Sequence, residues 1–237
     1  QLAFKKMNYA KGIWDSPWVG IKNFTFLFRS PDSWIIIRNT ILYNIVFIFL
    51  GTAFSVFIAI LLNECSRKWQ KRYQTLILIP HLLSYVVVSY IAYAFLGAEN
   101  GMINNQILRP LGLDPISFYT EDKYWPFILV FVNIWKTFGY SSIIYFASII
   151  GIDRTYYEAA EVDGASAWTQ IWSITLPLLK PVLITMLLLS VGRILYSDFG
   201  LFYQTVKSSA LLESVTDVID TYVFRLLISS GDVGVSA

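Results

Sequence analysis

Four long apolar stretches dominate the pattern of hydrophobic and polar positions along the chain. They cover roughly residues 36–63, 74–97, 125–150 and 178–200. Each is long enough to cross a membrane, since a helix needs about 20 apolar residues to cross the hydrocarbon core. The pattern therefore predicts an all-α, multi-pass membrane protein. A fifth stretch, 221–229, is about half that length and contains Arg225, which predicts an interfacial or re-entrant helix.

The composition agrees with a protein embedded in a lipid bilayer. The 237 residues are 56% hydrophobic and only 14% charged, with a mean hydropathy of +0.56, whereas soluble domains carry roughly 25% charged residues. The net charge of +2 gives no basic field for nucleic acid, so no nucleic-acid partner is expected. Cys65 is the single cysteine and His81 the single histidine, which excludes an internal disulfide and a histidine-pair metal site. No metal is expected.

Loop charges predict the orientation of the chain in the membrane. Four basic residues lie in the short loop between the first two spans: Arg67, Lys68, Lys71 and Arg72. The positive-inside rule places this loop in the cytoplasm. Counting spans from there puts 98–124 and 201–233 outside and returns 151–177 to the cytoplasm. The first 35 residues also fall outside, although the five basic residues among them oppose that placement.

The segment 151–177 is predicted to form a short helix, a tight turn and a second helix. Thr155 and Glu158 fit a capping box, in which two side chains satisfy amides at a helix start. Gly164 is where a left-handed residue would end this first helix.

The second helix of the segment is predicted to begin at Ser166, whose side chain would cap it. Pro177 and Pro181 would end or bend it before the next span. The segment 151–177 contains four acidic residues and one basic residue, so the loop has a net charge of −3. Because an acidic cytoplasmic loop runs against the positive-inside preference, it favours a docking surface for a basic partner.

The sequence of this loop resembles the EAA motif of ABC importer permeases, which reads EAA-x3-G-x9-I-x-L-P. Every defined position matches: Glu158, Ala159, Ala160, Gly164, Ile174, Leu176 and Pro177. The resemblance extends over nearly the whole chain. "SPWVGIKNF" and the first span resemble the oligosaccharide branch of the type I importers, which includes the maltose permeases. "SDFGLFYQ" and "VIDTYVFR" resemble its LplB-like polysaccharide permeases.

This resemblance implies a single transmembrane permease domain over residues 1–237, an all-α helical bundle with the MetI-like fold of type I ABC importers. One flanking span is expected to be missing at each end. The resemblance also implies a multi-pass protein of the bacterial cytoplasmic (inner) membrane. Its partners would be a second permease subunit, two ATP-binding subunits and an extracytoplasmic solute-binding protein, and its substrate an oligosaccharide.

In such importers the EAA loop is a coupling helix that sits in a cleft of the ATPase subunit. The resemblance assigns this role to Glu158, Ala159, Ala160, Asp163, Gly164, Ile174, Leu176 and Pro177. Glu158 would pair with a basic group of the ATPase, cap the helix, or do both. The sequence contains no GxxxxGK[ST] motif, so ATP and Mg are expected on the partner ATPase. No cofactor and no catalytic residue are expected on this chain, which is predicted not to be an enzyme.

Polar residues within the spans predict the substrate path, because each is costly if it faces lipid. In the third span, Asn133, Lys136, Thr137 and Tyr140 recur at a spacing that places them on one face of a helix. Asn133, Trp135 and Tyr140 also resemble the sugar-site layout of the maltose-type permeases. Lys136 and Thr137 depart from that layout, which argues against a maltose-like ligand.

The fourth span is predicted to contribute Ser190, Arg193, Ser197 and Asp198 to the same path, with Arg193 near its middle. Lys136 and Arg193 allow two interpretations. Two cations on one path would favour an acidic or phosphorylated saccharide. Alternatively, they would pair with acids or helix carbonyls of the sister permease.

The aromatic residues of the second span also allow two interpretations, sugar stacking or an interfacial belt. They are Tyr85, Tyr90, Tyr93 and Phe95. Other function classes fit less well. An intramembrane enzyme would need HExxH, GxSxG or an aspartate pair, and none occurs. A secondary transporter would show inverted repeats and paired acids, and the sequence shows neither, so this class is the weaker alternative. A permease of the same fold for a non-sugar solute is the alternative.

Overall fold

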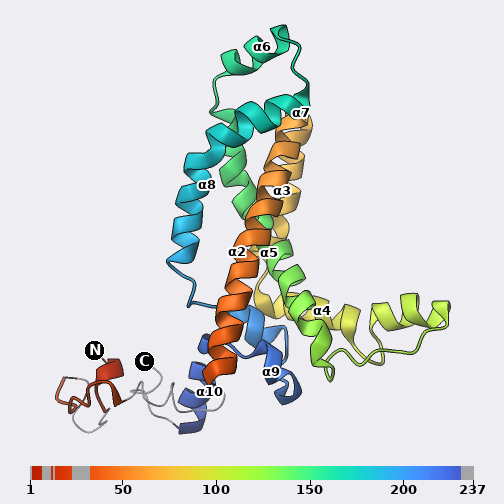
Figure 1. The fold of residues 1–237 in the computed structure, drawn as a ribbon. Helices are drawn as coiled ribbons and strands as arrows, with labels where there is room; N and C mark the ends of the chain where they lie inside the picture. Colours follow the sequence, from red (N-terminus) through yellow and green to blue (C-terminus); the bar gives the residue numbers. More distant parts are fainter. Residues whose placement is uncertain (1, 7–11, 13, 23–32, 231–237) are drawn as a thin grey trace. The chain divides into compact units, whose positions relative to one another are not determined.

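The computed structural model describes residues 2–6, 12, 14–22 and 33–230, and the regular elements in this part of the chain are helical (Figure 1). The α-helices are α2 (Ser33–Glu64), α3 (Arg67–Leu82), α4 (Tyr85–Leu96), α5 (Trp125–Ile150), α6 (Arg154–Val162), α7 (Ala167–Gln170), α8 (Leu176–Val191), α9 (Glu213–Thr216) and α10 (Ile219–Ser230). Short 3-10 turns cover Leu2–Phe4, Arg109–Leu111, Asp122–Tyr124 and Ala210–Leu212, and π-helical turns cover Ile103–Leu108, Ile171–Thr175 and Gly200–Gln204. The predicted all-α class is confirmed.

Contacts divide the chain into two compact units. One comprises residues 45–84 and 130–194 and is called the coupling unit, because it contains the EAA loop. The other comprises residues 1–44, 85–129 and 195–237 and is called the terminal unit. The assignment of all 237 residues to one transmembrane domain stays a prediction.

Helices long and apolar enough to cross a membrane occur near three of the four predicted positions. In the described residues they are Ser33–Glu64, Asp122–Ile150 and Ala167–Val191, and α3 with α4 supplies a fourth if the two count as one broken span. The second predicted span is thus interrupted. Pro80 lies in the last turn of α3, and Leu83 has extended backbone angles (φ −70°, ψ 138°) before α4 begins at Tyr85.

The fourth predicted span is displaced toward the N-terminus. Helical backbone begins at Ala167, passes through the π-helical turn Ile171–Thr175 and ends at Val191, so it covers 178–191 of the predicted span but not 192–200. The helix does not end at Pro177 or Pro181, and a bend at these prolines, the other expected outcome, stays a prediction. Pro177 lies in the first turn of α8, where its missing N–H costs little because the hydrogen-bond register has just changed from π to α.

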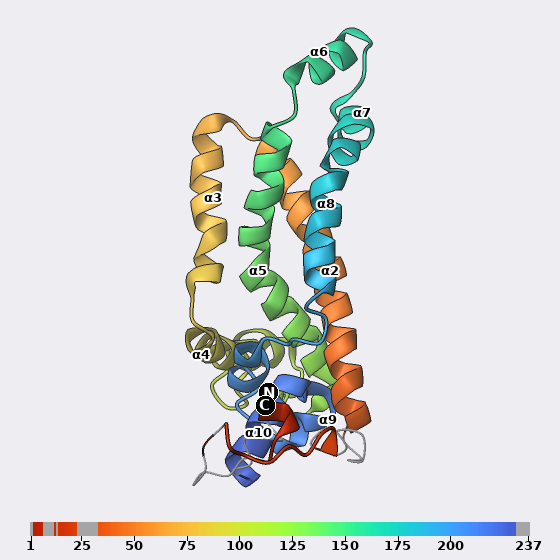
Figure 2. The same cartoon turned by 90° about the vertical axis from the view of Figure 1, so that its left-hand side faces the viewer.

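Side chains of α2, α5 and α8 form the hydrophobic core of the coupling unit. In Figure 2, α3, α5 and α8 run side by side, with α6 beyond their ends. The core cluster consists of Val56, Ala59, Leu62, Tyr145, Phe146, Ile149 and Leu179. Gly139 of α5 lies against the backbone of α3 at Ile77. The outer face of α8 stays exposed, with Leu188 and Leu189 more than half accessible, as expected of a helix that faces lipid or another subunit.

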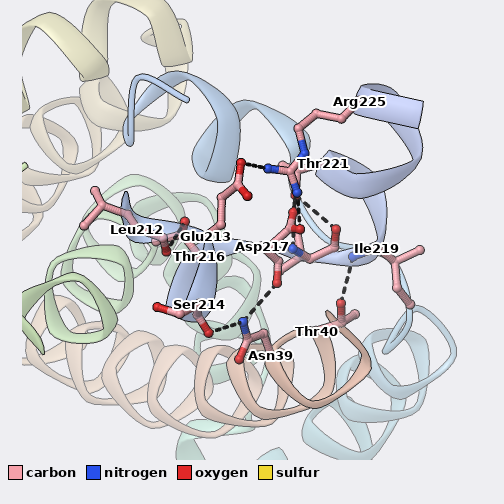
Figure 3. Close-up of polar contacts among 11 residues, drawn as sticks. Asn39, Thr40, Leu212, Glu213, Ser214, Thr216, Asp217, Ile219, Thr221 and Arg225 are labelled. Carbon is pink, nitrogen blue, oxygen red and sulfur yellow. Dashed lines mark hydrogen bonds and ion pairs between the residues drawn. The ribbon is translucent and has the colours of Figure 1, made fainter. Parts of the chain in front are cut away.

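Polar contacts hold the terminal unit together (Figure 3). The Asn39 side-chain amide of α2 donates to the backbone carbonyl of Asp217 at 3.0 Å. The Arg225 guanidinium of α10 pairs with the carboxylates of Glu213 and Asp217. Burial raises the pKa of the Asp217 carboxyl, while Thr221 and Arg225 act in the opposite direction. A helix forms around Arg225 as predicted, and the arginine charge has partners within the chain. The interfacial or re-entrant placement of this helix stays a prediction.

We expect Gly139→Ala to destabilise the protein. A Cβ atom at this position would lie 1.8 Å from the carbonyl oxygen of Ile77, which is backbone and cannot move without displacing α3. Overpacking of this kind costs about 1–3 kcal/mol in the free energy of unfolding. Thermal unfolding of the purified protein in detergent measures the effect.

Gly51→Ala is the matched control, because Gly51 also lies inside a helix of the coupling unit but a Cβ there would meet nothing within 4 Å. This variant should be as stable as the natural protein or more so, since alanine favours the helix by about 1 kcal/mol over glycine. Equal destabilisation by both substitutions would contradict the close approach of α3 and α5.

Candidate coupling loop and translocation path

Asp153 starts the first helix of the EAA loop. Its carboxylate accepts a hydrogen bond from the Thr155 backbone N–H at 3.0 Å, and its backbone is extended (φ −62°, ψ 129°), as in a helix N-cap. The predicted capping box of Thr155 and Glu158 is therefore wrong. Hydrogen bonds from Thr155 lower the pKa of the Asp153 carboxyl, so the cap is ionised at neutral pH. The signal was present in the sequence, since aspartate is itself a preferred N-cap.

Gly164 ends the helix as predicted. Its φ of +77° is in the left-handed region, and two hydrogen bonds close the turn around it. The Ala165 N–H donates to the carbonyl of Ala160 at 2.8 Å, and the Gly164 N–H donates to that of Glu161 at 3.0 Å. This is the Schellman arrangement. A Cβ at Gly164 would meet nothing within 4 Å in this chain, so backbone conformation alone accounts for the glycine here.

The second arm of the loop is fixed at two points. Ser166 caps α7 as predicted, since its hydroxyl accepts from the Thr169 N–H at 3.3 Å. The hydroxyl of Tyr157 in α6 lies 2.9 Å from that of Thr175, a buried residue just before α8. Tyr157 was not among the predicted residues. Its partner lies 18 residues away at the undefined position of the motif, so no local pattern indicated the contact.

The first part of the motif forms an exposed surface on α6 and its turn. Tyr156 is 56% exposed and Val162 89% exposed. Glu158, Ala159, Asp163 and Gly164 are also exposed, whereas Ala160 is half-buried. Exposed apolar side chains next to small residues and acids suit a surface that another protein covers.

The last part of the motif anchors the loop to the helices. Ile174, Leu176 and Pro177 are half-buried, and Leu176 packs against the core cluster of the coupling unit. A cleft of about 640 Å³ separates α6 from the ends of α2, α3 and α5. Charged side chains of both signs line it, namely Glu64, Arg67, Arg154, Glu158 and Glu161.

Lys136 is buried where α3 ends. Its ammonium donates to the backbone carbonyls of Pro80 at 3.4 Å, His81 at 3.0 Å and Leu83 at 2.5 Å. The last carbonyls of a helix have no intrahelical partner and form the negative end of its dipole. The chain itself therefore supplies the helix carbonyls that had been expected from a sister permease.

The rest of the predicted stripe on α5 has mixed exposure. Asn133 is buried, and its backbone carbonyl accepts from the Thr137 hydroxyl at 2.8 Å. Tyr140 is 52% exposed and stacks on the His81 ring at 4.9 Å between centroids. A substrate-path role for Asn133, Thr137 and Tyr140 stays a prediction.

The predicted stripe on the fourth span is not formed as one helical face. Ser190 lies in α8, where its hydroxyl donates to the Met186 carbonyl at 2.9 Å. Arg193, Ser197 and Asp198 follow the helix end at Val191 and so do not continue its periodicity. The backbone N–H of Ser197 donates to the Asp220 carboxylate at 2.8 Å, and Asp198 accepts from the Leu201 N–H at 3.3 Å. Arg193 is thus not in the middle of a span.

Comparison with known protein families identifies the family of this chain. A family described as "binding-protein-dependent transport system inner membrane component" matches residues 37–198, which include the whole EAA loop. The chain belongs to this family. The predicted ABC importer permease is therefore confirmed, and the protein is a membrane-embedded permease subunit.

Known permeases and a solved transporter structure are similar to this chain over most of its length. Protein LplB of Bacillus subtilis (strain 168) is 33% identical, over 97% of this chain and 72% of its own. The polygalacturonan/rhamnogalacturonan transport system permease protein YteP of the same organism is also 33% identical, over 97% of this chain and 71% of its own. A crystal structure of a bacterial ABC transporter involved in the import of the acidic polysaccharide alginate superposes with a TM-score of 0.86. It is 32% identical and covers 94% of this chain and 77% of its own.

Gly164→Ala should reduce transport by this permease, and Gly164→Asn should restore much of it. Alanine in the left-handed region costs roughly 1–2 kcal/mol, whereas asparagine tolerates it. ATP-dependent uptake by membrane vesicles that contain the complete transporter measures the effect. If asparagine is as harmful as alanine, the position requires the absence of a side chain and the conformational explanation is wrong.

Lys136→Met should destabilise the permease and lower uptake of neutral and acidic solutes equally. Methionine keeps a long side chain but removes the hydrogen bonds to three carbonyls, and loss of a charged donor costs about 1.5–3 kcal/mol. Unfolding in detergent and uptake in vesicles are the two measurements. Lys180→Met, at an exposed lysine of α8, is the control and should be neutral. Normal stability with a loss confined to acidic solutes would instead assign the ammonium to ligand binding.

Proposed function

We propose that this permease imports oligosaccharides, acidic ones included, across the bacterial cytoplasmic membrane. The similarity to a polygalacturonan/rhamnogalacturonan permease and to an importer of the acidic polysaccharide alginate carries this proposal. Each similarity extends over more than nine-tenths of the chain, so it includes the helices that would line a path as well as the EAA loop. Galacturonate and alginate units both carry carboxylates, which makes a negatively charged saccharide the best-supported substrate.

The EAA loop would transmit ATP hydrolysis to the spans. Its exposed part, around Glu158 and Val162, would dock on an ATP-binding subunit, while its anchored part continues without interruption into α8. A push on α6 would then move α8 as a rigid body, because the Schellman turn and the Tyr157–Thr175 contact join the two arms. Rigid-body rocking of this kind produces alternating access.

The complete transporter would contain a second permease subunit, two ATP-binding subunits and an extracytoplasmic solute-binding protein. ATP and Mg would bind to the ATP-binding subunits, and this chain would not catalyse hydrolysis. A crystal structure similar to this chain contains an alginate transporter in complex with a pentasaccharide-bound periplasmic protein, at 32% identity and a TM-score of 0.84. That similarity supports delivery of a saccharide by a separate protein.

Glu158→Lys should decrease the amount of ATP-binding subunits that copurify with the permease and abolish ATP-dependent uptake. The reversed charge would face the basic surface that the acidic loop is proposed to dock on. Quantified copurification and uptake of labelled saccharides by vesicles, with and without the solute-binding protein, are the measurements.

Glu99→Lys is the control for copurification, because Glu99 is also an exposed acid but lies in the segment predicted on the opposite side of the membrane. It should retain the ATP-binding subunits. Unchanged copurification in Glu158→Lys would refute the docking role of this carboxylate, and a transporter that takes up no saccharide would refute the substrate class.

A further inference from the structure

Three tyrosine rings surround the ammonium of Lys207 in the terminal unit. Its Nζ lies 3.3 Å from the ring centroid of Tyr93 and 5.9 Å from those of Tyr90 and Tyr119. All three distances are within the range of cation–π attraction. Tyr90 and Tyr93 come from α4 and Tyr119 from the segment before α5, so two separate parts of the chain meet at the segment that contains Lys207. We call these four residues the tyrosine–lysine platform.

The backbone that presents Lys207 is in an unusual conformation. Lys207 and Ser208 are consecutive residues with φ of +55° and +51°, and neither is glycine. The turn is fixed against Tyr119 from both sides. The Tyr119 hydroxyl donates to the carbonyl of Thr205 at 3.4 Å, and the Ser209 hydroxyl donates to the carbonyl of Tyr119 at 3.3 Å. Backbone in this region is kept where its surroundings over-determine it, commonly at binding sites.

The charge of Lys207 has no carboxylate partner in the described part of the chain. Ion pairs there include those of Lys123 and Arg225, and none of them involves Lys207. Burial raises the pKa of the Tyr119 phenol to about 12, so the hydroxyl is neutral at physiological pH and does not balance the ammonium. Lys207 itself is exposed, and Tyr90 is 68% exposed. The platform therefore presents a positive charge and accessible aromatic rings together.

We infer that the tyrosine–lysine platform is a contact site for an acidic saccharide, in which the Lys207 ammonium binds a sugar carboxylate and Tyr90 contacts the sugar ring. An ammonium held on aromatic rings still has N–H donors for a carboxylate, and aromatic rings pack against the C–H faces of sugars. The predicted topology places 201–233 on the extracytoplasmic side, from which the substrate arrives.

This inference rests on the proposed function and assigns part of its specificity to one residue. It also chooses between the two interpretations of the aromatic residues in the second span. An interfacial belt needs aromatic rings but no cation among them, whereas recognition of a uronate needs both a cation and an aromatic ring. Lys136 already donates to backbone carbonyls of its own chain. The cation that attracts an acidic ligand would therefore be an exposed one, Lys207.

Uptake by the complete reconstituted transporter tests the inference. The probes are a short oligogalacturonate and its fully methyl-esterified form, which keeps the rings but lacks the charge. Lys207→Met should raise the KM for the oligogalacturonate about three- to ten-fold, the range of a partly exposed ion pair, and leave the ester unchanged. Lys207→Arg should restore the natural KM for the oligogalacturonate. Tyr90→Leu should weaken uptake of both probes, because both present the same ring.

Lys123→Met is the matched control. The Lys123 ammonium also lies over a tyrosine ring, 4.8 Å from the centroid of Tyr124, but it already pairs with Glu121 at 2.7 Å. This variant should transport both probes normally, and copurification of the ATP-binding subunits verifies that each variant is assembled.

Each result decides between the inference and the function on which it rests. Unchanged KM values in Lys207→Met, an equal loss for both probes, or a natural permease that prefers the ester would overturn the inference and leave saccharide import intact. A natural permease that takes up neither of these two probes nor any other saccharide would overturn the proposed function and the inference with it.

Discussion

Backbone carbonyl groups that leave helical geometry in an apolar segment need hydrogen-bond donors, because hydrocarbon supplies none. The contact between the Lys136 ammonium and the end of α3 meets this requirement. It allows the second predicted span to break after Leu82 without unpaired carbonyls at Pro80, His81 and Leu83. The helix dipole also offsets the charge of the buried ammonium, so no carboxylate is needed beside it. Lys136 therefore stabilises the break whatever ligand the permease carries.

The coupling loop combines local and tertiary contacts. Its local contacts each join residues at most five apart: the Asp153 cap that starts α6, the Gly164 turn and the Ser166 cap that starts α7. The contact between Tyr157 and Thr175 then joins its two arms, and Leu176 anchors the second arm in the core. The loop is therefore firmly attached to the spans, while its side chains at Tyr156 and Val162 remain exposed. Such a shape suits an element that transmits a push from another subunit.

Lys136 and Lys207 have the same side chain but different roles, because their environments differ. Lys136 is buried with backbone carbonyls of its own chain, whereas Lys207 is exposed above tyrosine rings without a carboxylate partner in the described residues. The sequence directed attention to Lys136, because a charge within an apolar stretch is conspicuous. Lys207 follows the fourth apolar stretch, where a charge is ordinary, and its partners Tyr93 and Tyr119 are more than eighty residues away.

The sequence by itself determined the helical class, the approximate place of the spans and the helix–turn–helix of the EAA loop. Hydrophobic runs, a left-handed glycine and a serine cap are local signals, and each acts within one or two turns of helix. Tertiary structure decided the break after Leu82, the displaced start of the last span, and the partners of Tyr157, Lys136 and Lys207. These depend on groups that are distant in sequence and meet only once the helices pack. Local periodicity could not predict them for that reason.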